Sequence, residues 1–226
     1  MLMTAHLTLL AEVPGFHFIQ AAWTFLQKGG VFMIPLGITS IAGMTAVLYK
    51  FLSLSSGRII PPRLARQVQD FQELAITGKT EPLLKEFEQG ESTLARLAAV
   101  AVKHRGKPRA EITTAVEAAA REETARLHAG ISVLDTVITI SPLLGLLGTA
   151  SGLVTIFEGL GEEANYLTIA RGIAEAMTTT IFGLAIAVPG VIANGYFTRR
   201  IEMITVRLEA LLADLAHVCQ KSSDKS

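Results

Sequence analysis

The stretch SPLLGLLGTASGL, Ser141 to Leu153, decides the fold class. It has no charged residue and carries a stripe of small residues at helical spacing: Ser141, Gly145, Gly148 and Gly152, with Thr149 beside them. A helix in a soluble core fills such a face with large side chains. Helices in lipid instead associate through small residues that let their backbones approach. The stretch therefore indicates a helix that packs inside a membrane.

Two further uncharged runs accompany this one. The chain has 226 residues, and only 18% of them are charged. The uncharged runs are Gly29–Tyr49, Thr136–Phe157 and Ala176–Thr198. A bilayer core of about 30 Å needs roughly 20 helical residues to cross it. The alternative is a soluble bundle of buried helices, but such long runs seldom recur three times in one soluble domain. We predict an all-α integral membrane protein with three transmembrane helices.

The basic residues predict the orientation of these spans. The long loop after the first span and the tail after the third hold nearly all of them, and only Lys28 and Arg171 lie elsewhere. Positive charge stays on the cytoplasmic side. The expected segments are a periplasmic N-terminus with an interfacial helix (1–28), a first span (29–52), a cytoplasmic helical loop (53–128), a second span (129–158), a periplasmic hairpin (159–170), a third span (171–198) and a cytoplasmic helical tail (199–226).

The loop is expected to be helical and not a disordered linker. Its apolar periodicity is interrupted at Pro61-Pro62, Gly78, Gly90 and Gly106, and Ser92 is a candidate helix cap. After Pro108 the sequence predicts one long helix that runs straight into the second span. The tail continues the third span as an amphipathic helix. Helices 2 and 3 should therefore have long cytoplasmic extensions.

Enzymatic chemistry finds no support in the sequence. The five histidines are scattered without metal-ligand spacing, and Cys219 is the single cysteine. We find no phosphate-binding loop, zinc-protease helix or nucleophile elbow. Net charge is zero, which gives no reason to expect nucleic acid. We expect no catalytic residue, no metal site and no cofactor.

The third span carries a stripe that matches the one in the second. Its members are small or polar and recur every three or four residues: Ala176, Thr180, Gly183, Ala187, Gly190 and Asn194. Two such stripes suggest close packing of the two spans against each other, against copies of the chain, or around something slender.

Hydroxyl groups and one acid suggest an ion pathway along these stripes. Thr149 lies in the second span, Thr179 and Thr180 lie in the third, and Glu175 opens the third. A polar lining of this kind is what an ion or proton needs inside hydrocarbon. The alternatives are purely structural. Each threonine hydroxyl would bond the backbone of its own helix, and Glu175 would be a structural anchor whose charge is favoured at a helix N-terminus.

Two stretches resemble the MotA/TolQ/ExbB proton-channel family, closest to the ExbB/TolQ branch. They are SPLLGLLGTASGLVTIF (141–157) and IARGIAEAMTTTIFGLAIAVPGVIANGYF (169–197). The resemblance is dense over residues 139–198 and looser from about 30 to 215. One departure is Tyr49-Lys50, where many relatives have Glu-Arg.

The resemblance implies a motor subunit of the bacterial inner membrane. Such proteins form a homopentamer around a dimer of a single-span ExbD/TolR-like partner, sometimes with a TonB/TolA-like protein. Thr149 and Thr180 match the family's pore threonines, and Glu175 matches its glutamate. The transported ion would be H⁺, with Na⁺ open because of the extra Thr178 and of Thr179, where some proton-driven members have alanine. A passive three-span scaffold, whose glycines only pack, and a small transporter that works alone are the competing interpretations.

Overall fold

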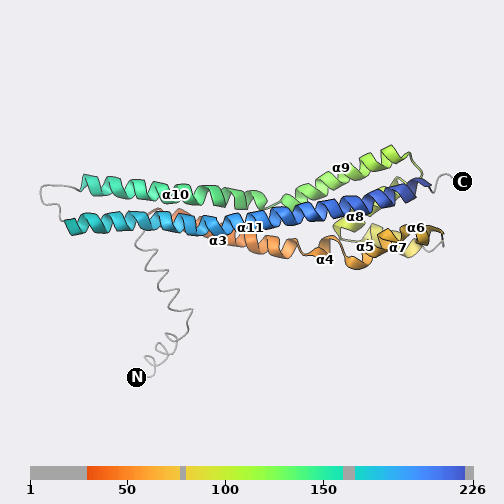
Figure 1. The fold of residues 1–226 in the computed structure, drawn as a ribbon, viewed down its shortest axis with the longest axis horizontal. Coiled ribbons are helices and arrows are strands. Elements are labelled where there is room, and N and C mark those ends of the chain that lie inside the picture. The colour runs from red at the N-terminus through yellow and green to blue at the C-terminus, as the bar shows by residue number, and fades with distance from the viewer. Residues whose placement is uncertain (1–29, 77–79, 160–165, 222–226) are drawn as a thin grey trace, which may run out of the picture. The chain divides into compact units, whose positions relative to one another are not determined.

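The computed structural model describes residues 30–76, 80–159 and 166–221 (Figure 1). Every regular element in those ranges is an α-helix, which confirms the all-α prediction. The helices are α3 (Met33–Ser53), α4 (Ser56–Ile59), α5 (Pro62–Gln69), α6 (Phe71–Ile76), α7 (Glu81–Gln89), α8 (Thr93–Lys103), α9 (Arg109–His128), α10 (Ile131–Glu158) and α11 (Tyr166–Lys221). The expected interfacial helix within 1–28 lies outside the described residues.

Three of the described helices are long and apolar enough to cross a membrane. They are α3, α10 and the part of α11 from Ile169 to Gln220. α10 and this part of α11 contain the second and third uncharged runs, and α3 contains the first run from Met33 onward. The third candidate is 52 residues long, which is more than twice the roughly 20 residues that a bilayer core requires.

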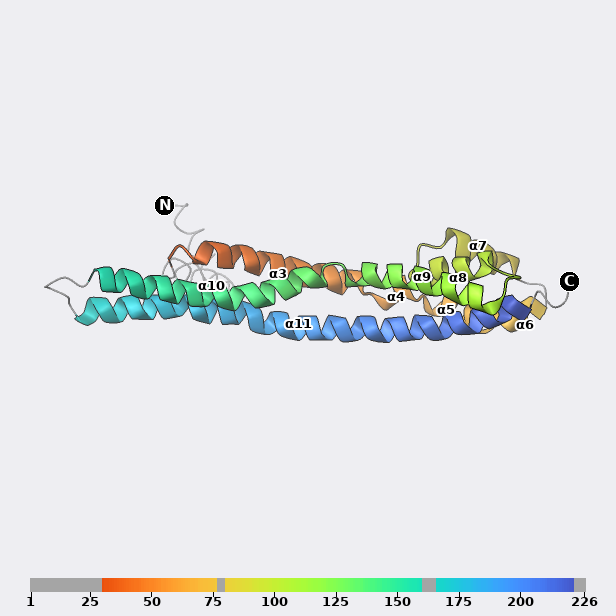
Figure 2. The same cartoon turned by 90° about the horizontal axis from the view of Figure 1, so that it is seen from above.

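The contacts divide the chain into two units. Unit 1 contains residues up to Thr45 and Val133–Ile192, and unit 2 contains Ala46–Ser132 and the residues from Ala193 onward. In unit 1, α10 lies along the first half of α11 in both views (Figures 1 and 2). α3 also packs on α10, because a Cβ atom at Gly43 would lie 3.0 Å from the Val137 side chain.

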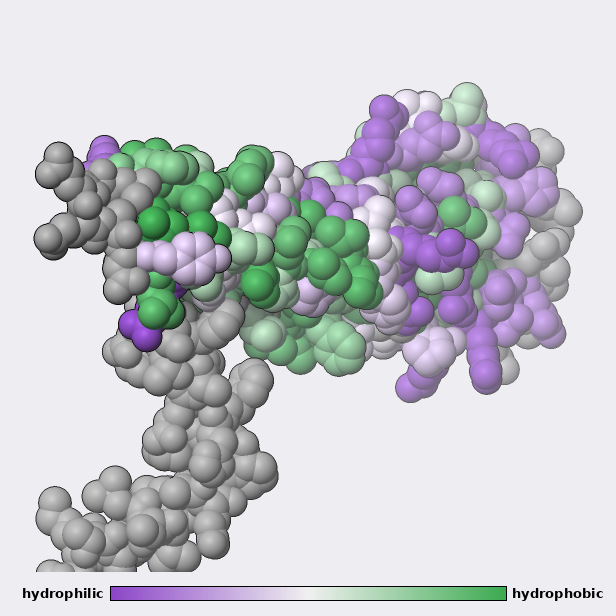
Figure 3. Space-filling model, turned by 60° about the vertical axis from the view of Figure 1, so that its left-hand side comes forward, coloured by the Kyte–Doolittle hydropathy of each residue, from purple (hydrophilic) through white to green (hydrophobic). Residues whose placement is uncertain are grey.

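Large apolar side chains cover much of the surface of unit 1. Figure 3 shows hydrophobic surface over the helices of unit 1 and hydrophilic surface over unit 2. The exposed apolar residues include Ile34, Ile38 and Ile41 on α3, Leu146 and Leu147 on α10, and Ile181 and Leu184 on α11. An exposed apolar surface of this extent is rare on soluble monomers and fits contact with lipid.

Helix α8 forms the centre of unit 2. Its apolar face is fully buried through Leu94, Leu97 and Ala98, and it packs against α7 on one side and α9 on the other. The predicted cap is confirmed, because the Ser92 hydroxyl accepts a hydrogen bond from the Ala95 amide at 3.1 Å.

The prediction of one helix through the second span is wrong at a single place. α9 ends at His128 and α10 begins at Ile131. Gly130 has a φ of +84°, and Ala129 has a ψ of 130°, so neither residue is helical. Glycine adopts this left-handed conformation at no steric cost and often follows a helix end. α11, by contrast, continues without a break through Pro189.

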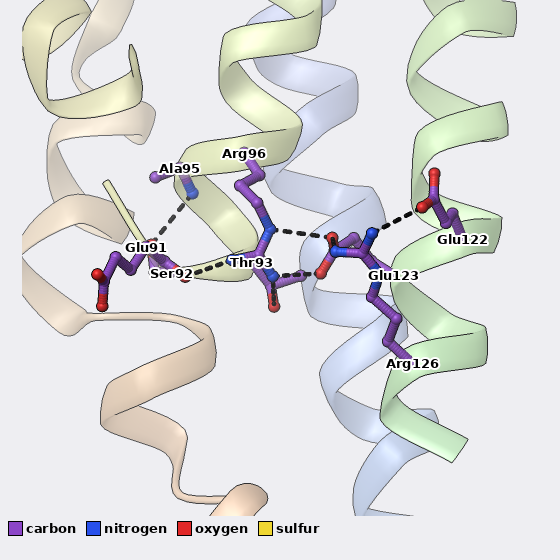
Figure 4. Close-up of polar contacts among 8 residues, drawn as sticks. All are labelled: Glu91, Ser92, Thr93, Ala95, Arg96, Glu122, Glu123 and Arg126. Carbon is purple, nitrogen blue, oxygen red and sulfur yellow. Dashed lines mark hydrogen bonds and ion pairs between the residues drawn. The ribbon is translucent and has the colours of Figure 1, made fainter. Parts of the chain in front are cut away.

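A bidentate ion pair joins α8 to α9 in unit 2 (Figure 4). Arg96 Nε donates to Glu123 Oε1 at 2.9 Å, and Arg96 Nη2 donates to Oε2 at 2.5 Å. Arg126 adds a bond to Oε1 at 3.2 Å. Burial acts to raise the pKa of Glu123, but the hydrogen bonds and charge of Arg96 and the charge of Arg126 outweigh it. The pKa of Glu123 is therefore lowered.

This pair should make the stability of unit 2 depend on pH. A carboxylate whose pKa is lowered by folding stabilises the fold above its unfolded pKa of about 4.3, and that stabilisation disappears as the pH falls through the folded value. We expect Glu123→Gln to lower the free energy of unfolding by about 1–2 kcal/mol at pH 7. The difference from wild type should shrink towards zero between about pH 4 and pH 2. Thermal unfolding of the detergent-solubilised chain across this range measures it.

Glu122→Gln is the matched control for this prediction. Glu122 pairs with Arg126 at 2.7 Å, but both side chains are more than half exposed. An exposed pair of this kind contributes about 0.3–0.5 kcal/mol. Equal losses in the two variants, or a Glu123→Gln difference that does not change with pH, would contradict the account of the ion pair.

Candidate ion pathway between α10 and α11

The two stripes of small residues face each other in unit 1. A Cβ atom at Gly145 would lie 2.9 Å from the Thr180 Cα atom, and one at Gly152 would lie 2.7 Å from the Ala176 Cβ atom. One at Gly183 would overlap the backbone oxygen of Ser141. Real Cβ atoms do not approach this closely, so glycine is what allows the two backbones to meet.

Of the other stripe residues, Ser141 and Gly190 also lie at the contact between α10 and α11. Ser141 is fully buried and donates to the Val137 carbonyl at 2.6 Å. A Cβ atom at Gly190 would lie 3.0 Å from the Ile138 side chain. Ala187 is buried in unit 1, and Asn194 is half-buried in unit 2.

Two threonines and one carbonyl meet where Gly145 approaches Thr180. Thr180 Oγ1 donates across the helix pair to the Gly145 carbonyl oxygen at 2.9 Å. The hydroxyls of Thr149 and Thr180 lie 3.3 Å apart. Thr149 Oγ1 also bonds its own helix, through the Leu146 carbonyl at 2.7 Å. The missing Cβ of Gly145 exposes its carbonyl to the neighbouring helix.

The neighbouring threonines serve other purposes in the structure. Thr179 is only 1% exposed, and a Cβ atom at Gly148 would lie 2.6 Å from its Cγ2 atom. Thr179 therefore packs against Gly148, one residue along each helix from the Thr149–Thr180 pair. Thr178 bonds the Ala174 carbonyl of its own helix at 2.8 Å. The helix backbone includes Glu175, but its side chain lies outside the described part of the structure.

One packing residue escaped the sequence analysis. A Cβ atom at Gly172 would lie 2.7 Å from the Ile156 Cγ1 atom, so the close contact extends one turn beyond Ala176. The signal was present, because Gly172 precedes Ala176 by four residues and continues the same stripe.

The chemistry at this place is that of neutral oxygen atoms. A hydroxyl both donates and accepts hydrogen bonds, so the Thr149–Thr180 pair can extend a chain of hydrogen bonds between α10 and α11. The same hydroxyl and carbonyl oxygens are the kind of ligand that a desolvated cation takes in a channel. Among residues 30–76, 80–159 and 166–221, no cluster of three His, Cys, Asp or Glu side chains is placed to hold a metal.

Residues 69–210 match a family described as the MotA/TolQ/ExbB proton channel family. The match covers more than half of the chain and includes both facing stripes. The chain belongs to this family. Membership, together with three apolar helices, indicates an inner-membrane protein.

Curated relatives place the chain in the ExbB/TolQ branch of the MotA/TolQ/ExbB family. It is 29% identical over 190 residues to an ExbB homologue of Methanothermobacter thermautotrophicus, covering 84% of this chain and 67% of the relative. It is 34% identical over 170 residues to an ExbB-like protein of Synechocystis sp., covering 71% and 64%. The Methanothermobacter and Synechocystis proteins are both described as biopolymer transport proteins. It is 40% identical over 98 residues to the Tol-Pal system protein TolQ of Pseudomonas aeruginosa, covering 42% of each.

Lys50, the departure from the family pattern, has a defined place in unit 2. Its side chain is 1% exposed, and its Nζ atom donates to the Leu127 carbonyl oxygen at 2.7 Å. That carbonyl belongs to the last turn of α9, where carbonyls lack partners within the helix. Lys50 therefore closes the end of α9 next to the Ala129–Gly130 break, and the negative end of the helix dipole favours its charge.

Lys50→Met should loosen the end of α9. Methionine keeps the apolar stem of the side chain but removes the donor to Leu127, so we expect a loss of about 1–3 kcal/mol. Hydrogen–deuterium exchange of residues 125–132 should accelerate, with little change in α8. Lys85→Met, at an exposed position on α7, is the control. Unchanged exchange at 125–132 in Lys50→Met would show that the buried amine does not stabilise this junction.

Proposed function

We propose that the chain is a proton-conducting motor subunit. With an ExbD/TolR-like partner it converts the ion motive force into mechanical work on the cell envelope, as in TonB-dependent-type transport. The observation that carries the proposal is the bond from Thr180 to the Gly145 carbonyl, with the Thr149 hydroxyl 3.3 Å away. These hydroxyls lie on two helices with no charged residue between Thr136 and Phe157 or between Ala176 and Thr198.

The proposed assembly is a homopentamer around a dimer of the single-span partner, in contact with membrane lipid. A TonB/TolA-like protein is the candidate partner beyond the membrane. Names of the relatives, which include biopolymer transport and Tol-Pal proteins, support this setting. The N-terminus would be periplasmic, and the residue 53–128 loop and the 199–226 tail would be cytoplasmic. The distribution of basic residues supports this orientation.

In this mechanism an acidic group of the partner would exchange protons beside Thr149 and Thr180. Glu175 would lie on the same pathway, towards the outer surface. Thr179 and the glycines would hold α10 and α11 at the separation that keeps the hydroxyls in register. Thr178 would have no part in conduction, because its hydroxyl is bound within its own helix.

Sodium is the second candidate ion. Hydroxyl and carbonyl oxygens, which the Thr149–Thr180 site presents, are ligands that a desolvated cation accepts. Flux of a complex in liposomes separates the two ions: proton flux that persists when sodium is replaced by N-methylglucamine identifies a proton conductor, and flux that requires sodium identifies the alternative.

Native mass spectrometry tests the assembly. The tagged chain is extracted gently from its own membrane, and the masses of the complex and its components are measured. Five copies with two copies of a single-span protein that has a membrane aspartate are expected. A monomer, or an oligomer without a partner, would contradict the proposal and favour the passive scaffold.

A further inference from the structure

The turn between α8 and α9 concentrates positive charge on unit 2. Its sequence is KHRGKPR, and four of its basic side chains are exposed: Lys103, Arg105, Lys107 and Arg109. We name these residues, 103–109, the basic turn. Lys107 forms an ion pair with Glu111 in the first turn of α9.

The backbone holds the basic turn in one conformation. Gly106 has a φ of +86°, which suits glycine. The Lys107 amide donates to the His104 carbonyl at 3.2 Å, and the Gly106 amide donates to the Cys219 carbonyl of α11 at 3.5 Å. The charges are therefore presented from a folded turn, which costs little further ordering when a partner binds.

Helix α7 presents the opposite charge. Leu83 and Phe87 are buried, and α7 packs on α8 through this face. The carboxylates are exposed on the other faces and outnumber the single Lys85: Glu81, Glu86 and Glu88, followed by Glu91 just after the helix. None of these four carboxylates takes part in an ion pair among the described residues.

No ion pair joins the basic turn to α7 among the described residues. α8 packs against both α7 and α9. Two different patches that bind each other form head-to-tail contacts between copies, and such contacts close into rings when the rotation allows.

We propose that the basic turn of one copy docks on α7 of the next copy. This inference rests on the proposed homo-oligomer and adds the residues that set the order of its copies. A contact between two basic turns, or between two α7 helices, would place like charges together, which disfavours symmetric pairing. The charges therefore give the contact a direction.

Crosslinking between two differently tagged copies tests this contact directly. Both copies carry Cys219→Ala; one carries Lys107→Cys and the other Glu88→Cys. They are expressed together as full-length chains and oxidised in the membrane. The expected product joins the two tags. A disulfide that joins two Lys107→Cys copies, or no disulfide although native mass spectrometry still finds an oligomer, would overturn the head-to-tail contact and leave the proposed function intact.

Charge-reversal substitutions provide the second part of the crosslinking test. Lys103→Glu with Arg109→Glu in the Lys107→Cys copy should lower the disulfide yield by about tenfold, because each repelling contact costs a kcal/mol or more. Adding Glu86→Lys and Glu81→Lys to the Glu88→Cys copy should restore it. Arg63→Glu with Arg66→Glu, two exposed positions on α5, is the matched control and should leave the yield unchanged.

The crosslinking results distinguish the molecules that could bind the basic turn. Loss on reversal and recovery on double reversal support a second copy. An unchanged yield after reversal, or a loss that the reversed α7 does not restore, would overturn the proposal and point to an acidic partner protein or to anionic lipid. A chain that is monomeric in native mass spectrometry before any substitution would instead contradict the proposed function itself.

Discussion

Ion flux through the reconstituted complex should fall by about tenfold or more when Thr180 is replaced by valine. Valine has nearly the shape of threonine, so α10 and α11 should still pack. It lacks the hydroxyl that donates to the Gly145 carbonyl and faces Thr149. Removing a hydrogen-bonding group from an apolar pathway costs about 1–3 kcal/mol, and each 1.36 kcal/mol is a factor of ten in rate. Fluorescent pH measurement in liposomes detects the change.

Thr178→Val is the control that the chain itself offers. It lies two residues away on the same helix, and its hydroxyl bonds the Ala174 carbonyl one turn earlier. We expect its flux to remain within about twofold of wild type, because that bond lies within α11. Equal flux in Thr180→Val and wild type would remove these hydroxyls from the ion pathway and favour the passive scaffold.

Gly183→Ala should be the most damaging single methyl group in unit 1. A Cβ atom there would overlap the Ser141 backbone oxygen, and backbone cannot rotate away as a side chain can. The helices must separate, which we expect to cost about 1–3 kcal/mol as overpacking. The separation of the helices should also break the hydrogen bond from Thr180 to the Gly145 carbonyl. The free energy of unfolding and the ion flux should therefore fall together. Titration with SDS in mixed micelles measures the unfolding.

Gly37→Ala tests whether the effect belongs to the contact or to glycine. Gly37 lies in α3, and a Cβ atom there would meet nothing within 4 Å. Alanine should stabilise that helix slightly, by about 0.5–1 kcal/mol. If Gly183→Ala were as stable as Gly37→Ala, the close approach of α10 and α11 would not exist in the membrane.

The sequence predicted most helices well because the signals that start and end them are local. Uncharged runs, proline and glycine breaks, and the Ser92 cap all act within a few residues, and the described helices begin and end close to them. The break between α9 and α10 was missed because alanine-rich sequence favours helix on both sides. A single glycine, Gly130, lies at the break, and Lys50 bonds the last turn of α9 from a distant part of the sequence.

The sequence predicted which residues form the candidate site, but it did not predict which hydrogen bonds they make. The spacing placed Gly145 and Thr180 on two stripes, with Thr149 beside the first, and left open whether the stripes pack against each other, against copies or around something slender. It did not show that Thr180 bonds across to α10 while Thr178 bonds its own helix, since that depends on which side of α11 faces the partner helix. The ion pair of Arg96 with Glu123 joins residues 27 positions apart, and no local pattern announces such a contact.

The central claim is that this chain conducts ions in company with a single-span partner. The most direct measurement is proton flux into liposomes that contain the wild-type chain, with and without the single-span protein recovered with it from its membrane. We expect flux when both proteins are present, and we expect this flux to be lost when the partner's membrane aspartate is changed to asparagine. Flux no greater than that of empty liposomes with both proteins present would contradict it.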